Sequence, residues 1–318
     1  MIFTCRNIRL SRSPFGGLNR NPMIMPLRLA VATEDLNTSL KIAIGRAGTC
    51  EVAGVRLNSR SEVPADKVTN SSIRQILLSV RERQMKVAGL LCPTRHELYE
   101  PEYLEPRLNI IRQSMTLAPK LETSELIIRC GHIPDNNDAA PVASSTVDIE
   151  DKSNPFSFAP ERTTARPPAA NFSLLCEILN DLTRHGNHVG CSLQLQVPEY
   201  NEALIQTLFA AVTAGPLNIV FDPATAIMTG ANPTRVFRNL YQKVGYIRAR
   251  DAVRNTDGAG TEASIGHGVV DWCALLPTLD EADYGGWTCV ERTGGDNRPD
   301  DVAQGVSHLK SLIPSNND

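Results

Sequence analysis

The chain has 318 residues, of which 42% are hydrophobic and 21% charged, and its formal net charge is −3. These values are typical of a globular protein large enough for one α/β barrel. The slightly acidic balance excludes a broad basic surface for nucleic acid. No apolar run approaches the roughly 18 residues of a membrane-spanning helix. We therefore expect neither a nucleic acid nor a membrane as a partner.

The eight cysteines stand singly, and no two of them form a C-x-x-C pair. This spacing indicates a reducing compartment without a disulfide framework, so we expect a cytoplasmic protein. Residues 1–26 contain four arginines and no acid. That composition resembles a transit peptide. We favour a disordered tail, or a true start at Met23 or Met25, and assign residues 27–318 to one domain.

From residue 27 onward, short apolar runs alternate with longer amphipathic ones. The apolar runs predict strands over residues 27–32, 54–57, 87–92, 126–130, 190–197, 217–221, 244–249 and 287–290. The amphipathic runs predict helices over residues 36–47, 71–83, 102–117, 172–184, 202–214, 232–242, 270–279 and 300–311. Eight strands that alternate with eight helices predict parallel βαβ units, and eight is the number that closes a ring. The expected fold is a single (β/α)8 TIM barrel.

The segment over residues 134–170 interrupts this rhythm. It is rich in Asp, Asn, Ser, Pro and Thr, and it lacks apolar periodicity. Because it follows the fourth expected strand, it would leave the barrel at the end where active sites lie. Two interpretations remain open: a functional lid or protomer contact, the latter implying a homodimer, and an unstructured insertion.

Polar side chains stand at the carboxyl ends of the later expected strands, where barrels build their active sites. Asp222 follows one strand and Glu291 follows the last, while Arg248 lies near the end of the strand between them. A carboxylate at the end of so apolar a strand needs a partner, and Arg248 is the obvious partner for Glu291. Asp222 precedes a proline, so a turn-forming role is the alternative there.

Several phrases resemble the sugar phosphate isomerase/epimerase family, whose members are xylose isomerase-like TIM barrels. The resemblance spans roughly residues 27–312 and rests on the pattern as a whole. The phrases are residues 91–95, 129–134, 192–196, 220–225, 247–252, 266–272 and 290–296. The later ones read Ser-Leu-Gln-Leu-Gln, Val-Phe-Asp-Pro-Ala-Thr, Ile-Arg-Ala-Arg-Asp-Ala, Gly-His-Gly-Val-Val-Asp-Trp and Val-Glu-Arg-Thr-Gly-Gly-Asp.

The resemblance implies a divalent metal held by Glu, Asp, His and Glu on the last four strands. Asp222 and Glu291 match two of these ligands. Gln196 stands in place of the first Glu, although a shift of two residues would put Gln194 there, and Arg248 stands in place of the His. Gln binds a hard cation more weakly than a carboxylate does, and Arg has no lone pair to give. We therefore expect a degenerate metal site and no cofactor; Mn, Mg, Co or Zn at Asp222 and Glu291 is the alternative.

The family resemblance implies proton transfer beside the carbonyl of a sugar or sugar phosphate. Glu291, Arg248 and Gln196 are then the expected catalytic residues. The expected ligand contacts are Asp222, Gln194, Arg129, His132, Arg250 and Arg292. Two alternatives stay open: a non-catalytic descendant that binds a sugar or organic anion, and a lyase similar to the inosose dehydratases. Whether the chain is an enzyme depends on that choice.

Overall fold

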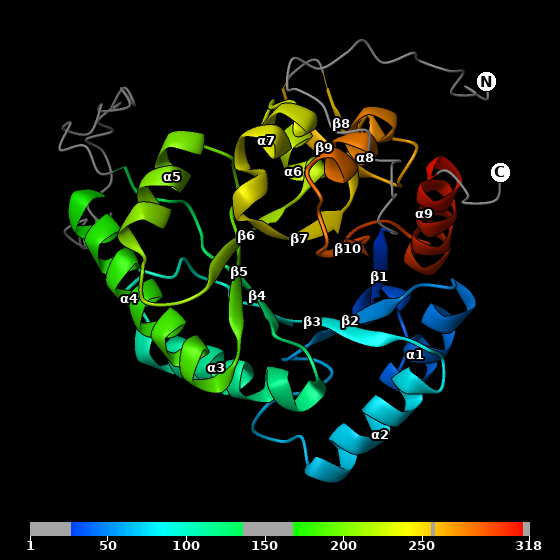
Figure 1. The fold of residues 1–318 in the computed structure, drawn as a ribbon, viewed down its shortest axis with the longest axis horizontal. Helices are drawn as coiled ribbons and strands as arrows, with labels where there is room; N and C mark the ends of the chain where they lie inside the picture. The colour runs from blue at the N-terminus through cyan, green and yellow to red at the C-terminus, as the bar shows by residue number, and fades with distance from the viewer. Residues whose placement is uncertain (1–26, 136–167, 256–257, 314–318) are drawn as a thin grey trace, which may run out of the picture.

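The computed structural model describes residues 27–135, 168–255 and 258–313. The expected tail over residues 1–26 lies outside the described residues, as does most of the expected loop over residues 134–170. Eight parallel strands close into a barrel in the order β1-β10-β7-β6-β5-β4-β3-β2, and helices surround this ring (Figure 1). The predicted (β/α)8 architecture is confirmed. No helix in the described part of the chain is long and apolar enough to cross a bilayer.

Each barrel strand lies within two residues of its predicted position. The strands are β1 (Arg28–Ala32), β2 (Gly54–Asn58), β3 (Lys86–Cys92), β4 (Glu125–Arg129), β5 (Ser192–Gln196), β6 (Leu217–Phe221), β7 (Val244–Ala249) and β10 (Trp287–Val290). The larger helices are α1 (Leu40–Thr49), α2 (Asn70–Arg81), α3 (Leu104–Leu117), α4 (Pro168–Val189), α5 (Glu202–Ala211), α7 (Pro233–Leu240), α8 (Trp272–Glu281) and α9 (Arg298–Leu312).

Two features at the carboxyl end of the barrel were not predicted. A short helix, α6 (Pro223–Met228), begins directly after β6, with Asp222 as its N-cap and a proline at its first position. A hairpin of β8 (Asp251–Arg254) and β9 (Gly260–Ala263) follows β7. Its strands are four residues long and polar, so they give no period-two apolar signal. Both features lie where the barrel presents its polar side chains.

The helix expected over residues 36–47 begins four residues later than predicted. A 3₁₀ turn, η1 (Thr33–Leu36), follows β1 and ends at Asn37, whose φ of 55° is left-handed. The α-helix then starts at Leu40. The turn is important because it carries Glu34 and Asp35 to the carboxyl end of the barrel.

The barrel interior is apolar toward the amino ends of its strands. The ring of Trp287 lies against Gly54, where a Cβ atom would come within 2.8 Å of the indole. Only glycine therefore fits at position 54, and the tryptophan fills the space. Further along the strands, Ala30, Ala32 and Tyr246 belong to the same buried interior cluster. Gln194 and Glu125 interrupt this layer, and the ion pairs described below lie beyond it.

Candidate functional site

Four charged residues face the barrel interior from neighbouring strands. The strands β6, β7, β10, β1 and β2 follow one another around the ring. Asp222 follows β6, Arg248 lies in β7, Glu291 follows β10 and Arg56 lies in β2. All four are buried, with at most 8% of any side chain exposed. The order of the parallel strands thus brings together residues that are far apart in the sequence, such as Arg56 and Glu291, which are 235 positions apart.

Arg248 lies between the two carboxylates. Its Nε and Nη2 each donate to Glu291 Oε2 at 2.7 Å, and its Nη1 lies 3.4 Å from Asp222 Oδ2. Arg250 adds two bonds to the same Asp222 oxygen, from Nε at 2.9 Å and from Nη2 at 2.7 Å. The predicted pairing of Arg248 with Glu291 is present, and the guanidinium also reaches Asp222.

The pairing continues on both sides of this centre. Arg56 Nη2 donates to Glu34 Oε1 at 2.7 Å, while Arg56 Nε lies 3.4 Å from Glu291 Oε1. On the other side, Arg250 Nη1 lies 3.4 Å from Glu262 Oε1 in β9. We call this alternating series the ion-pair chain; its members are Glu34, Arg56, Glu291, Arg248, Asp222, Arg250 and Glu262.

Sequence reasoning missed three members of the ion-pair chain. Glu34 and Glu262 lie in the unpredicted turn and hairpin, so their sequence context gave no signal. Arg56 could have been found, because it interrupts the strand Gly-Val-Arg-Leu-Asn, whose residues are all buried. A buried arginine in such a strand requires an anionic partner.

Electrostatics keep Glu291 ionised. Burial raises the pKa of Glu291, but the nearby charges of Arg248 and Arg56 outweigh burial and hold this pKa below its ordinary value. Burial lowers the pKa of Arg248, but Glu291 and Asp222 outweigh that effect and raise it above its ordinary value. Asp35 behaves differently: burial and the charge of Glu291 raise its pKa to about 7. The centre therefore holds a permanent ion pair beside a carboxyl group that titrates near neutrality.

Asp222 has two structural tasks at once. Its Oδ1 accepts the Thr225 N–H at 3.1 Å and so caps α6, while its Oδ2 accepts from Arg250 and Arg248. The Asp222 N–H in turn donates to the hydroxyl of Tyr200 at 2.6 Å. The two interpretations offered by the sequence are therefore compatible, because each carboxylate oxygen serves one of them.

The two glutamine candidates lie in different places. Gln194 is buried, and its Nε2 donates to Glu125, the first residue of β4, so it lies toward the amino end of the barrel and away from the ion-pair chain. Gln196 is half-buried at the carboxyl end of β5 and pairs in register with Arg129. Of the two, only Gln196 is at the correct end for the expected role.

The remaining candidates are peripheral. Arg129 is exposed, and His132 is also exposed and pairs with Glu97 through its Nδ1 at 2.9 Å. Arg292 joins the periphery of the ion-pair chain, 3.4 Å from Glu262 and 2.9 Å from Asp301. The structure thus joins Asp222, Arg248, Arg250 and Glu291 directly and Arg292 through Glu262. It does not join Gln194, Gln196, Arg129 or His132 to them.

Asp251 anchors a loop. Its carboxylate accepts N–H bonds from Gly266 and Val270 at 3.0 Å each, and the indole N–H of Trp272 at 3.3 Å. A Cβ atom at Gly268 would lie 2.0 Å from Asp251 Oδ1, so the loop can approach only as glycine. The phrase over residues 266–272 therefore folds around one buried carboxylate and positions α8.

The family resemblance implies a divalent metal, and these residues do not suit one. Two potential ligands, Asp222 and Glu291, are present, but the guanidinium of Arg248 contacts both and presents only N–H donors to that position. Gln196 contributes no negative charge. Among the residues that the structure describes, no three or more His, Cys, Asp or Glu side chains are arranged to hold a metal ion.

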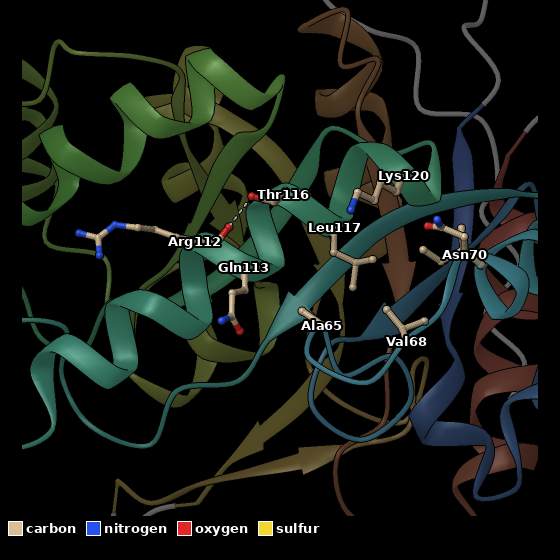
Figure 2. A pocket seen from close by; sticks show the side chains of 9 residues that line it. Ala65, Val68, Asn70, Arg112, Gln113, Thr116, Leu117 and Lys120 are labelled. Carbon is tan, nitrogen blue, oxygen red and sulfur yellow. Dashed lines mark hydrogen bonds between the residues drawn. The ribbon is translucent and has the colours of Figure 1, made fainter.

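A separate pocket lies in the outer layer, between α3 and the loop that leads into α2 (Figure 2). Its lining includes Ala65, Val68, Asn70, Gln113 and Lys120, and no member of the ion-pair chain. Arg112 extends away from the other labelled side chains in Figure 2 and pairs with Asp181 of α4 at 2.6 Å. Its charge is therefore already balanced. This pocket lacks the converging polar groups of a reaction centre.

A closed parallel barrel with charged side chains at its carboxyl end defines the class of TIM barrel proteins. The family model for xylose isomerase-like TIM barrels matches residues 156–312. The matched segment and the closed barrel make the chain similar to the xylose isomerase-like TIM barrels. No curated protein matches the sequence significantly.

Solved structures share this fold at low sequence identity. A xylose isomerase domain protein from Planctomyces limnophilus has a TM-score of 0.71 and 18% identity, with 90% of this chain and 97% of that chain covered. A D-tagatose 3-epimerase-like protein has a TM-score of 0.66 and 14% identity, with coverages of 90% and 97%. The 3-keto-D-glucoside 4-epimerase from E. coli has a TM-score of 0.64 and 10% identity, with coverages of 90% and 99%.

Proposed function

We propose that the chain is a carbohydrate isomerase or epimerase that moves a proton beside a carbonyl group without a divalent metal. Glu291 Oε1 takes the proton from the carbon, which leaves an enediolate. Isomerisation returns this proton to the neighbouring carbon while the hydroxyl proton moves to the former carbonyl oxygen; epimerisation instead adds a solvent proton to the opposite face of the original carbon, and Glu291 releases its proton to solvent. The guanidinium of Arg248 supplies the fixed positive charge that stabilises the enediolate oxygen. Two structural neighbours, a D-tagatose 3-epimerase-like protein and a 3-keto-D-glucoside 4-epimerase, support carbohydrate chemistry for this barrel.

One observation carries the proposal: the two oxygens of Glu291 have different surroundings. Oε2 accepts both bonds from Arg248, so the side chain is held in one orientation. Oε1 is buried and accepts no hydrogen bond from the residues that the structure describes. A general base needs such an oriented carboxylate with a free oxygen.

The fixed charge is supplied by arginine rather than by a metal. Arg248 remains protonated at every physiological pH, and its planar group matches carboxylate geometry. Its bonds to Glu291 and its contact with Asp222 hold it where a dication would have to bind both carboxylates. A preorganised cation in a buried site can stabilise developing negative charge.

The test is solvent proton exchange. Protein treated with EDTA is incubated in D₂O with a panel of ketohexoses, including D-tagatose, and with their phosphates; deuterium at the carbon beside the carbonyl is measured by mass spectrometry. We expect incorporation with the wild type and none with Glu291→Gln. Glu125→Gln is the matched control, because it also removes a carboxylate, which is half-buried at the opposite end of the barrel. Absence of exchange across the panel would refute the proposal.

A second candidate is a binding protein without turnover. It is favoured by the lowered pKa of Glu291, because a carboxylate between two guanidinium groups is a weak base. Thermal-shift screening with the same sugars separates the two functions: a binder is stabilised by a ligand whose carbon-bound protons do not exchange. A lyase would instead release water from its ligand, and mass spectrometry of the same reactions detects that loss.

A further inference from the structure

Two charged groups lie side by side in the barrel and still have atoms without hydrogen bonds. Arg56 Nε and Nη1 donate to nothing, and Glu291 Oε1 accepts from nothing, among the described parts of the chain. Arg56 Nε lies 3.4 Å from Glu291 Oε1, which places the charges together without the geometry of a hydrogen bond. The remaining polar atoms of both side chains have partners: Arg56 Nη2 donates a hydrogen bond to Glu34, and Glu291 Oε2 accepts from Arg248.

Such atoms are rare in a folded interior. Buried donors and acceptors almost always have partners, and leaving a charged one without a partner costs more than a hydrogen bond contributes. Here one free donor, Arg56 Nε, lies 3.4 Å from one free acceptor, Glu291 Oε1, and the side chains of Arg56 and Glu291 are 2% and 0% exposed. A position of this kind is suited to one oxygen atom that can both accept and donate.

Small side chains border this position. Ala32 of β1 pairs in register with Arg56, and Val31 pairs with Val290, so Ala32 lies between Arg56 and Glu291 in the ring. Ala32 shares the buried interior cluster with Ala30 and Tyr246. The Tyr246 hydroxyl is also buried without a hydrogen-bond partner within the described residues. Three polar groups in this part of the interior therefore lack partners beside small side chains.

We infer that Arg56 and Glu291 form a subsite for a hydroxyl group of an uncharged carbohydrate. The hydroxyl oxygen accepts from Arg56 Nε or Nη1, and its proton is donated to Glu291 Oε1. A phosphate or carboxylate oxygen has no proton to donate and would face the negative charge of Glu291, so the subsite selects against anionic groups. This inference rests on the proposed function, because it holds the hydroxyl-bearing carbon next to the oxygen that takes the proton.

Crystallography of the full-length wild type tests the subsite without requiring turnover. Crystals are soaked separately in erythritol, a four-carbon polyol, and in inorganic phosphate. We expect an erythritol hydroxyl within about 3.2 Å of both Arg56 Nε and Glu291 Oε1, and no phosphate at that position. Direct hydrogen bonding between Arg56 and Glu291 with no erythritol oxygen between them, or phosphate in the subsite, would overturn the inference.

A matched pair of variants tests the same point in solution. Arg56→Lys removes the free guanidinium donors, and Arg298→Lys makes the same change at an arginine that pairs with Asp35, the neighbour of Glu34. The affinity for a neutral sugar found by thermal shift should fall at least tenfold in the first variant and less than twofold in the second. Equal affinities would overturn the subsite. Exchange assays on the wild type report separately on the proposed function, so the two can fail independently.

Discussion

Replacing Arg248 with alanine should destabilise the barrel strongly, because Arg248 is the central cation of the ion-pair chain. The substitution leaves Glu291 with Arg56 at 3.4 Å and leaves Asp222 with Arg250. Removing one partner of a buried ion pair costs about 3–5 kcal/mol. Because each carboxylate keeps one other guanidinium, we expect about 3 kcal/mol. Arg235→Ala is the control, since Arg235 is exposed on α7 and such changes cost at most about 0.5 kcal/mol.

The loss should depend on pH with a defined sign. In the wild type the pKa of Glu291 is below its ordinary value of 4.5, so Glu291 stabilises the fold above that pH. Without Arg248 the pKa rises, and this contribution is lost or reversed. The deficit measured by urea unfolding should therefore be larger at pH 7.5 than at pH 4.5. A loss below about 1 kcal/mol, or an equal loss at both pH values, would refute this electrostatic reasoning.

Three further outcomes are expected. The pKa of Asp35 is raised to about 7, so the free energy of unfolding of the wild type should fall by up to about 4 kcal/mol as pH rises from about 4 to about 7. Asp35→Asn should flatten this part of the pH profile measured by urea unfolding. An unchanged profile would contradict the assignment. Gln194→Glu places a second carboxylate against Glu125 and should lower the free energy of unfolding in urea at pH 7 by at least about 2 kcal/mol. Gln196→Glu, at a half-buried position, should lower it by less than about 1 kcal/mol. Equal losses in the two variants would contradict this prediction. Asp251→Ala leaves four N–H donors without their carboxylate acceptor and should lower the free energy of unfolding in urea by about 3 kcal/mol; a loss below about 1 kcal/mol would contradict the anchoring role.

The sequence predicted the barrel well because each buried parallel strand is a continuous apolar run. Residues 217–221, 244–249 and 287–290 gave strands with the bounds that the structure shows. Asp222, Arg248 and Glu291 stand at the ends of these strands, so parallel order alone was enough to bring them together. The pairing of Arg248 with Glu291 followed from charge and burial.

The rest of the site depends on information that is not local in sequence. Gln194 and Gln196 lie on the same side of β5, so only the register of the strand in the barrel decides which of them lies near the carboxyl end. Glu262 reaches Arg250 only because the β8–β9 hairpin folds back at that end. Arg56 meets Glu291 only because β1 and β2 close the ring against β10. Such tertiary contacts leave no periodic signal.

We propose that the Arg248 guanidinium takes the place of the divalent cation that the family resemblance implies, in a working proton-transfer site. The most direct measurement combines metal analysis of the purified chain with deuterium incorporation into ketohexoses after EDTA treatment, before and after addition of Mn²⁺. We expect less than about 0.1 metal ion per chain and the same exchange rate in all three conditions. Stoichiometric metal, or exchange that disappears with EDTA and returns with Mn²⁺, would contradict the claim.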